Sequence, residues 1–376
     1  MPRDLPRETA RLTAAALATI CLAFGGLVAR AADTDPAARG TYLAAAAGCA
    51  DCHTDAKNRG RPYAGGRALT TPFGTFYAPN ITPDPETGIG RWSDAQFLNA
   101  LREGLSPNGS NYFPVFPYPS FTKITDDDAR AIKAYLFAQP AVRQANRAHD
   151  VAFPFSWRFL LNGWKLLFFR PGPYRPAPER GEAYNRGAYL VTALAHCGEC
   201  HTPRNWFGAT EPSRFLAGTG HGPDGHAVPN ITSDPDTGIG NWNEQDIITL
   251  LKDGQTPDFD FVGGAMAEIV KNTARLTDAD RRAIAVYLRT LPAIGSGDPF
   301  RAKGCQIECI GTGRTGAFSY DAACRDGGAV WREGDRIRAW LVSNGSPWYC
   351  PVGARSEPTR RVPMPRSKSV ASGRTG

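Results

Sequence analysis

Two short pentapeptides constrain this 376-residue chain more than any other feature of its sequence. Both follow the pattern C-x-x-C-H, the first running from Cys49 to His53 and the second from Cys197 to His201. Two thiols three positions apart lie on one helical turn, and each can add to a vinyl group of the same porphyrin. The histidine that follows can then ligate the iron through an imidazole nitrogen. The pattern therefore predicts two covalently attached c-type haems.

Two other uses of paired cysteines are less consistent with the sequence. A zinc site needs four ligands that converge on one metal, whereas each pentapeptide lies in its own part of the chain. A thioredoxin-like pair follows a strand in a βαβ pattern, and the sequence shows no such pattern. The residues predicted to bind haem are Cys49, Cys52, His53, Cys197, Cys200 and His201, with His53 and His201 as iron ligands.

The N-terminal 31 residues have the pattern of a secretory signal peptide. Arg3, Arg7 and Arg11 precede a mostly apolar run over 12–28, and a small-x-small cleavage site occupies 29–31. The mature chain is expected to begin near residue 32. An uncleaved anchor is the alternative, although the apolar run is somewhat short for a full membrane span. Either alternative predicts an exported, periplasmic protein.

The net charge of +7 comes from the C-terminal segment. From Arg301 onward there are 13 basic and 6 acidic residues, so residues 1–300 are neutral overall. The basic balance therefore gives no indication of a nucleic-acid partner. Residues 297–376 are rich in Gly, Arg and Ser and show no sustained periodicity, which predicts a disordered tail. Zinc binding or disulfide pairing of its four cysteines, Cys305, Cys309, Cys324 and Cys350, has no supporting spacing pattern.

The organisation of the chain is set by an internal repeat. Each copy contains, in order, an R-G-x-Y-L segment, the C-x-x-C-H pentapeptide, P-N-I-T, T-G-I-G-x-W and a closing segment that ends in Tyr-Leu. Ser93, Thr125 and Thr277 are expected to be helix N-caps, and Pro140 and Pro292 to end the closing helices. We therefore predict an all-α chain with two tandem domains, 32–140 and 182–296, in which haem supplies much of the buried apolar surface.

The segment 141–181 between the two predicted domains is unusually aromatic for a linker. Phe153–Phe169 interleaves Trp, Arg and Lys with apolar residues, a composition that suits a membrane interface. It also lacks a clear polar face and has Pro-rich ends. On those grounds packing across both domains, which would fix the distance between the haems, is the favoured interpretation.

Taken together, these motifs resemble those of the cytochrome c subunits of periplasmic alcohol and gluconate dehydrogenases. The resemblance covers about 35–295 and rests on the paired C-x-x-C-H motifs, P-N-I-T, T-G-I-G-x-W and the Tyr-Leu closing helix. It implies class I cytochrome c folds, a periplasmic or membrane-associated dehydrogenase as electron donor, and quinone, another cytochrome or an oxidase as acceptor. Members of the family commonly have three haem domains, whereas this chain shows two.

The sixth iron ligand differs between the two repeats. Class I domains usually take a methionine from the loop before the closing helix, and Met266 is the residue so placed for haem 2. The loop 112–124 of the first repeat has neither Met nor His. Haem 1 is therefore expected to use His149, to use Lys123 or to remain five-coordinate. His196, His221 and His226 are expected in surface or loop positions.

Aromatic residues shared by the repeats, together with one arginine of the first repeat, are further candidates for haem contact. They are expected to pack on the haem edge, to bind its propionates or, for the tyrosines, to belong to the core. The main functional expectation is a di-haem electron-transfer cytochrome. A di-haem peroxidase and a haem-based sensor are the alternatives if haem 1 is open. The residues concerned are Tyr42, Arg91, Trp92, Tyr189 and Trp242.

Overall fold

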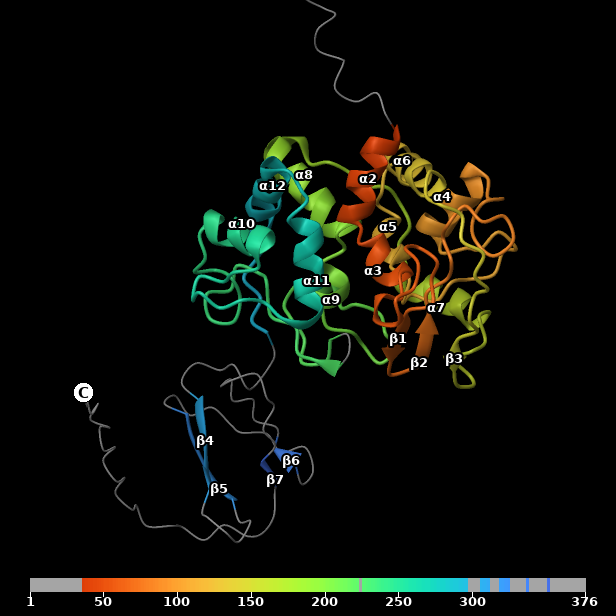
Figure 1. Cartoon of the computed structure of the whole chain (residues 1–376). Coiled ribbons are helices and arrows are strands. Elements are labelled where there is room, and N and C mark those ends of the chain that lie inside the picture. The colour runs from red at the N-terminus through yellow and green to blue at the C-terminus, as the bar shows by residue number, and fades with distance from the viewer. Residues whose placement is uncertain are drawn as a thin grey trace, which may run out of the picture. The chain divides into compact units, whose positions relative to one another are not determined.

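The computed structural model describes residues 36–222 and 225–296, together with four short strands beyond residue 300. The chain divides into two compact units, residues 1–298 and 299–376. The whole of the predicted signal peptide and most of the predicted disordered tail lie outside the described residues. In the second unit, β4 (Cys305–Gly311) pairs antiparallel with β5 (Phe318–Cys324), and β6 (Arg336–Ile337) pairs with β7 (Cys350–Pro351) (Figure 1).

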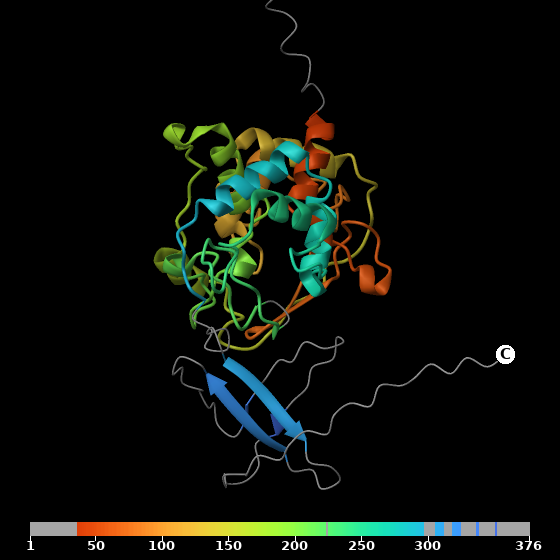
Figure 2. The ribbon, with the colours of Figure 1, turned by 90° about the vertical axis from the view of Figure 1, so that its left-hand side faces the viewer.

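The first unit is mainly helical, and its two repeats have the same order of elements. Helices α2, α6, α8 and α12 lie toward one end of this unit, and the hairpin β1–β2 lies toward the other (Figures 1 and 2). The first repeat contains α2 (Pro36–Ala46), α3 (Cys49–His53), α4 (Asp94–Glu103), α5 (Tyr118–Phe121) and α6 (Asp126–Phe137). The second contains α8 (Gly181–Tyr189), α9 (Gly198–His201), α10 (Glu244–Asp253), α11 (Gly264–Thr273) and α12 (Asp278–Arg289).

The helix starts expected from the sequence are confirmed. Ser93 forms a capping box with Gln96 at the start of α4, and Asn243 forms one with Asp246 at the start of α10. Thr125 and Thr277 each accept a hydrogen bond from the backbone N–H three residues later, at the starts of α6 and α12. Local sequence alone therefore fixes where these four helices begin.

A glycine in each repeat allows the first and last helices to pack closely. A Cβ placed at Gly40 in α2 would lie 1.9 Å from the carbonyl oxygen of Ala131 in α6. A Cβ at Gly187 in α8 would lie 1.9 Å from the carbonyl oxygen of Ala283 in α12. Only glycine fits at these two crossings, which explains the glycine of the R-G-x-Y-L segment in both repeats.

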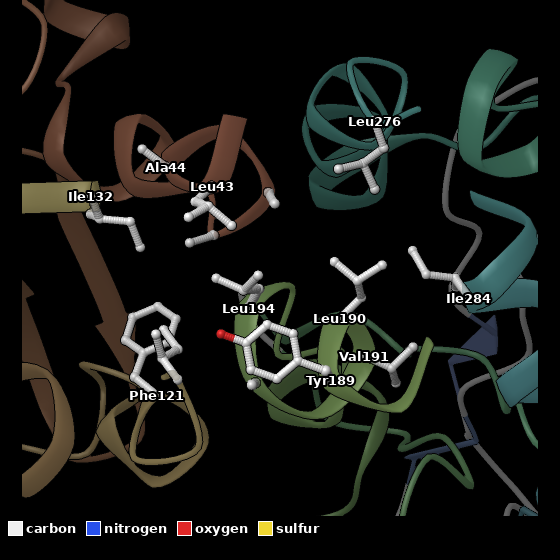
Figure 3. Packing of buried hydrophobic residues seen from close by; sticks show 14 of the residues in the cluster. Leu43, Ala44, Phe121, Ile132, Tyr189, Leu190, Val191, Leu194, Leu276 and Ile284 are labelled. Carbon is white, nitrogen blue, oxygen red and sulfur yellow. The ribbon is translucent and has the colours of Figure 1, made fainter. Parts of the chain in front are cut away.

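The two repeats share one hydrophobic core. Leu43 and Ile132 of the first repeat belong to the same cluster of buried side chains as Leu190 and Ile284 of the second (Figure 3). The helices of both repeats accordingly form a single compact unit. The apolar surface that one small helical unit leaves uncovered is thus buried in part by the other repeat. The domain boundaries drawn from the sequence remain a prediction.

The prediction of an all-α chain is confirmed only in part, because the first repeat also contains a small antiparallel sheet. Strand β1 (Ala68–Thr71) pairs with β2 (Gly74–Tyr77), and β2 pairs with β3 (Asp150–Val151). Threonine and aromatic residues favour the extended backbone here, and Gly74 takes a positive φ of 131° close to β3. The third strand comes from the 141–181 segment, and no local sequence pattern indicates a pairing over so long a distance along the chain.

The rest of the 141–181 segment also has regular structure. It contains α7 (Leu160–Phe168) and the short 3-10 turn η2 (Pro178–Arg180). Leu161 of α7 is buried in a small second cluster with Phe76 and Phe113. Among the residues that the structure describes, no helix has both the length and the apolarity to cross a bilayer.

Candidate haem-binding sites

Each C-x-x-C-H pentapeptide forms a single helical turn after a residue with left-handed backbone. Gly48 precedes α3 with φ 61°, and a Cβ there would lie 3.0 Å from Asp51 Oδ2. The equivalent residue of the second repeat is His196, with φ 39°. Such a value is uncommon for a residue with a Cβ, so the surrounding structure must hold His196 in place. The chain thus enters both pentapeptides through the same turn.

The histidine of each pentapeptide is oriented by a backbone carbonyl. His53 Nδ1 lies 2.7 Å from the carbonyl oxygen of Pro79, and His201 Nδ1 lies 2.8 Å from that of Pro229. Since a carbonyl can only accept, Nδ1 carries the hydrogen and Nε2 keeps its lone pair for a metal. Burial lowers the pKa of both histidines, and the hydrogen bond to the carbonyl opposes that shift. Both rings are therefore neutral and in the tautomer that an iron ligand requires.

The repeated P-N-I-T segment holds these carbonyls in place. In the first repeat the buried Asn80 accepts from the backbone N–H of Thr82 at 2.9 Å and donates to Thr87 Oγ1 at 3.1 Å. In the second, Asn230 accepts from the N–H of Thr232 at 2.8 Å and donates to Thr237 Oγ1 at 2.8 Å. The asparagine therefore links P-N-I-T to T-G-I-G-x-W. The sequence shows both motifs but does not show that the asparagine links them. The repetition of both motifs in the two halves of the chain was the only sequence signal for a shared structural role.

The four cysteines of the pentapeptides form no disulfide bond with one another. Burial raises the pKa of Cys49 and of Cys197 to about 12, and the neighbouring cysteine of each pair adds to the shift. A redox-active pair usually has a thiol of lowered pKa at a helix start, and the pKa of these two thiols is shifted in the opposite direction. Cys52 is the most exposed of the four.

The predicted distal ligand of haem 2 lies on a helix rather than in a loop. Met266 is partly buried in the first turn of α11. Two residues further on, Glu268 pairs with Arg67 at 3.1 Å, and Arg67 donates to the carbonyl oxygen of Asp51 at 2.6 Å. The helix that holds Met266 therefore also contacts the first pentapeptide. The role of Met266 itself stays a prediction.

Contacts between the repeats are reciprocal at the pentapeptides. Asp51 lies within the first pentapeptide, and its Oδ2 accepts from Asn272 Nδ2 of the second repeat at 2.5 Å. Glu199 lies within the second, and its Oε1 accepts from Ser120 Oγ of the first repeat at 2.7 Å. Ser120 and Asn272 each lie four residues before the apolar residue that precedes the closing helix. The segment before each closing helix thus binds the pentapeptide of the other repeat.

Two candidate ligands of haem 1 are engaged elsewhere. The backbone N–H of Tyr77 donates to His149 Nδ1 at 3.2 Å, so a neutral His149 ring carries its hydrogen on Nε2 and has no free lone pair there. Its ring also packs against Phe76 and Phe113. Lys123 Nζ lies 3.4 Å from the carbonyl oxygen of Thr192, and burial lowers its pKa although Glu199 opposes this. Neither side chain is therefore without a partner in this structure, and the sixth ligand of haem 1 stays a prediction.

His196 lies in the short loop between η3 (Leu190–Leu194) and α9, one of the two positions that the sequence suggested, but its ring is packed inside the unit. Its ring packs edge-on against Phe121 of the first repeat, with centroids 5.3 Å apart, and forms a hydrogen bond with the backbone of Ala47. Burial lowers its pKa, while the carboxylates of Glu199 and Asp51 oppose the shift. His196 therefore lies between the two pentapeptides. A lone histidine beside a cysteine gives no sequence pattern from which this contact could be inferred.

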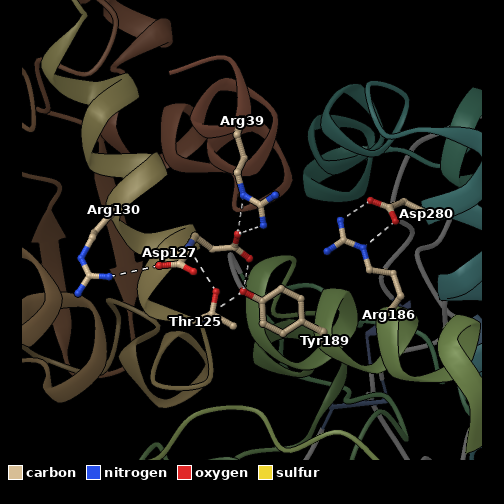
Figure 4. Close-up of polar contacts among 8 residues, drawn as sticks. Arg39, Thr125, Asp127, Arg130, Arg186, Tyr189 and Asp280 are labelled. Atoms are coloured by element: carbon tan, nitrogen blue, oxygen red, sulfur yellow. Dashed lines mark hydrogen bonds and ion pairs between the residues drawn. The ribbon is translucent and has the colours of Figure 1, made fainter. Parts of the chain in front are cut away.

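The two tyrosines, for which contact with haem or a place in the core was expected, connect the repeats. Tyr189 Oη donates to Asp128 Oδ2 at 2.6 Å, and Arg39 pairs with the same carboxylate at 2.6 Å (Figure 4). Tyr42 Oη donates to Asp280 Oδ2 at 2.6 Å, and Arg186 pairs with that carboxylate. Tyr189 is buried in the shared core and Tyr42 packs against it, which agrees with the core alternative, whereas binding of haem propionates stays a prediction. Trp92 and Trp242 pack against the shared core, and Arg91 is exposed.

The fold and these sites together define a c-type cytochrome. Two histidines in the iron-binding tautomer each follow a pair of thiols on one turn, so the residues present fit a covalently held haem at each site. Comparison with known proteins agrees. The cytochrome c family matches residues 37–138. The chain is 47% identical over 270 residues to a diheme cytochrome c-type protein of Cereibacter sphaeroides, an alignment that covers 69% of this chain and 88% of the relative.

Two further relatives are named as subunits of dehydrogenases. The cytochrome c subunit of alcohol dehydrogenase (quinone) from Gluconobacter oxydans is 38% identical over 327 residues, 83% of this chain and 67% of the relative. The gluconate 2-dehydrogenase cytochrome c subunit of Pantoea cypripedii is 34% identical over 357 residues, 91% of this chain and 79% of the relative. This chain belongs to the cytochrome c family and is an electron-transfer cytochrome with two covalently bound haem c groups.

Proposed function

We propose that the protein is a periplasmic di-haem cytochrome that passes electrons from a dehydrogenase partner toward the respiratory chain. The names of its relatives, which are cytochrome c subunits of alcohol and gluconate dehydrogenases, support the donor. The N-terminal pattern over 1–31 supports export, and covalent haem attachment in bacteria takes place outside the cytoplasm. Quinone, another cytochrome or an oxidase would be the acceptor.

Each repeat would hold one haem with the residues already described. Cys49 and Cys52 would form the two thioether bonds of haem 1, and His53 would be its iron ligand. The second repeat would use the equivalent residues, and Met266 would complete the coordination of haem 2. When bound, each haem supplies an iron that changes between Fe(II) and Fe(III). The residues of the second site are Cys197, Cys200, His201 and Met266.

One observation supports this proposal above the others: both pentapeptide histidines have Nδ1 fixed on a proline carbonyl, within a single unit that shares one core. The protein's part in electron transfer is then to hold two sites in a fixed relation. The hydrogen bonds of Asp51 and Glu199 across the repeats serve the same end. A carrier needs this rigidity because little rearrangement should accompany a change of charge.

The test uses the exported protein with its haems. Reduced-minus-oxidised spectra should show c-type haem at two per chain, and acid acetone should not extract it. Both haems should be reduced by a quinone-linked alcohol or gluconate dehydrogenase in the presence of its substrate. A colourless protein, or pigment lost to acid acetone, would contradict covalent haem. Failure of every dehydrogenase to reduce the protein would contradict the proposed donor only.

Haem 1 decides between the proposal and its alternatives. His149 and Lys123 are engaged elsewhere, which gives the peroxidase and sensor hypotheses their one structural support. Carbon monoxide should therefore bind one haem of the reduced protein. Rapid consumption of hydrogen peroxide would replace the carrier by a peroxidase. If carbon monoxide binds without changing turnover and without blocking electron transfer from the dehydrogenase, that result would agree with an electron-transfer protein.

A further inference from the structure

The residue directly before the first cysteine of each pentapeptide differs between the two repeats. The first repeat has Gly48 there, with φ 61°, and the second has His196, with φ 39°. Left-handed backbone is the conformation that glycine adopts without cost, whereas a histidine is held in it by its surroundings. Strain of this kind gathers at functional sites. The contacts of the His196 side chain are therefore of interest.

The two turns are otherwise alike, so the repeat itself provides a comparison. The backbone N–H of Asp51 donates to the carbonyl oxygen of Gly48 at 3.0 Å, and that of Glu199 donates to the carbonyl oxygen of His196 at 2.8 Å. In the first repeat a side chain has little room, because a Cβ on Gly48 would lie 3.0 Å from Asp51 Oδ2 and 3.7 Å from Asn272 Nδ2. Only the second repeat therefore places an imidazole at this position.

The imidazole of His196 contacts the first repeat in two ways. Its ring packs against the buried ring of Phe121, with centroids 5.3 Å apart, and it forms a hydrogen bond with the backbone of Ala47. Burial lowers the pKa of His196, and this hydrogen bond opposes the shift, so the ring is the donor and the Ala47 carbonyl the acceptor. The preceding helix η3 also contacts α2 and α5 of the first repeat.

These contacts connect the two haem-attachment turns through a short chain of bonded atoms. His196 directly precedes Cys197, and Ala47 lies two residues before Cys49. The chain of atoms runs from Cys197 through His196, across one hydrogen bond to the Ala47 carbonyl, and through Gly48 to Cys49. Electrons cross covalent bonds and hydrogen bonds more readily than an open gap of equal width, because the bonded atoms supply orbitals in between.

The other hydrogen bonds between the repeats at the pentapeptides lead elsewhere. Asp51 accepts from Asn272, and Glu199 accepts from Ser120. Both donors belong to the segments before the closing helices. The side chain of His196 instead reaches the residues that enter the first pentapeptide.

We propose that His196 is a positioning residue for electron transfer between the two haems, because it holds the two attachment turns together and supplies the bonded connection between them. One electron moves, so that Fe(II) of one haem becomes Fe(III) and Fe(III) of the other becomes Fe(II). No bond forms or breaks and no proton moves. The inference rests on the electron-transfer role proposed above, and it holds whichever donor and acceptor the protein uses.

The test is pulse radiolysis of the haem-loaded protein with less than one electron per molecule. The electron then redistributes between the haems at a rate that does not depend on protein concentration, followed at a wavelength where the two haem spectra differ. His196→Phe keeps a ring beside Phe121 but cannot donate to Ala47, and should slow this redistribution severalfold. His196→Gly places the residue of the first repeat in the second, which relieves the backbone, and should slow it at least as much.

Two conservative variants test for rescue. His196→Asn holds an amide donor at about the position of Nδ1, and His196→Gln holds one at about the position of Nε2. One of the two should restore a rate well above that of His196→Phe. Spectroelectrochemical titration of each variant should give haem potentials equal to those of the parent protein, so that the driving force is unchanged. Urea unfolding shows separately whether the fold is retained.

Matched controls are available at the same contact between the repeats. Ser120→Ala and Asn272→Ala each remove one hydrogen bond to a pentapeptide but leave His196 in place, so the redistribution rate should stay as in the parent protein. Parent-like rates in His196→Phe and His196→Gly would overturn the proposal. Equal slowing in the two controls would overturn it as well, because packing of the repeats as a whole would then set the rate. If no dehydrogenase reduces the parent protein, only the proposed donor fails, since the redistribution is still measured.

Discussion

The hydroxyl of Tyr42 donates a 2.6 Å hydrogen bond to Oδ2 of Asp280, which lies 238 positions later in the chain. Tyr189 makes the counterpart bond, also 2.6 Å, to Asp128 of the first repeat. Each tyrosine hydroxyl also accepts from the backbone N–H of the N-cap threonine before the same aspartate. In each repeat, the tyrosine of the R-G-x-Y-L segment thus forms hydrogen bonds with the first turn of the other repeat's closing helix. The same sequence motif makes both contacts.

Removing either tyrosine hydroxyl should destabilise the contact between the repeats. Tyr189→Phe leaves the carboxylate of Asp128, whose side chain is 3% exposed, without one donor, at a cost of about 1 to 3 kcal/mol. Tyr42→Phe should cost less because Asp280 is less buried. Urea unfolding of the haem-loaded protein gives both values.

The control for this pair is Tyr184→Phe in the same helix as Tyr189. Among the described residues, the Tyr184 hydroxyl takes part in no hydrogen bond, although its ring packs against Tyr287. Its replacement should change the free energy of unfolding by less than about 0.5 kcal/mol. Equal losses for Tyr184→Phe and Tyr189→Phe would show that the hydroxyl bond to Asp128 contributes nothing.

Alanine at either helix crossing should destabilise the fold strongly. Gly40→Ala and Gly187→Ala each place a Cβ 1.9 Å from a backbone carbonyl oxygen, so the helices must separate, at about 1 to 3 kcal/mol or more. Gly163 lies within α7, where an added Cβ would meet nothing within 4 Å, and Gly163→Ala should be neutral or stabilising. Thermal unfolding of the three variants measures the difference. Comparable melting temperatures for all three would contradict the close crossing.

The buried asparagine of P-N-I-T should affect both stability and redox potential. Asn230→Ala removes the bonds to Thr232 and Thr237 and should cost about 1 to 3 kcal/mol. It should also loosen the Pro229 carbonyl that accepts from His201, which lowers the basicity of the imidazole and raises the potential of haem 2. Spectroelectrochemical titration reports that potential.

The control for Asn230 is Asn241→Ala, which removes only an exposed hydrogen bond to the carbonyl oxygen of Pro235. This variant should leave the potential of haem 2 as it is in the parent protein and should cost less stability than Asn230→Ala. Equal potentials for the two variants would show that the buried asparagine does not act on haem 2 through the Pro229 carbonyl.

Met266→Leu tests the predicted distal ligand directly. A thioether ligand raises the potential of a haem, so its loss should lower the potential of haem 2 and let carbon monoxide bind a second haem. Leucine has a similar volume, and the fold should lose less than about 1.5 kcal/mol. Met364→Leu serves as the control. If potential and carbon monoxide binding are unaltered in the Met266 variant, another residue ligates haem 2.

Acid should weaken the second Arg–Asp pair over a defined range. Burial would raise the pKa of Asp280, but the hydrogen bonds from Arg186 and Tyr42 outweigh it and the net pKa is lowered. Its stabilising contribution is therefore complete above the unfolded value of about 3.9 and is lost as the pH falls through the lower folded value. Asp280→Asn should flatten the decline of stability below about pH 4.

The exposed Asp127, which pairs with Arg130 on the helix surface, provides the comparison for this pH dependence. Asp127→Asn should leave the acid limb of the stability curve as it is in the parent protein. Urea unfolding at a series of pH values is the measurement. An identical acid limb for the Asp280 variant and the parent protein would show that the carboxylate of Asp280 is not stabilised by folding.

The sequence by itself determined those features that depend on neighbours along the chain. The spacing of Cys49, Cys52 and His53 places three groups on one turn, and Ser93 or Thr125 starts a helix through its own hydrogen bonds. The internal repeat indicated that the two halves of the first unit contain the same helices in the same order. Family membership followed from those motifs, because they are local and specific.

The tertiary structure alone decided how the two halves meet. Nothing near His196 in the sequence indicates that its ring lies between the two pentapeptides, and nothing near Tyr42 points to Asp280. The third strand of the small sheet likewise comes from the 141–181 segment. These contacts join residues that are far apart in the chain, and their geometry depends on how the shared core packs, which no periodicity in one segment encodes.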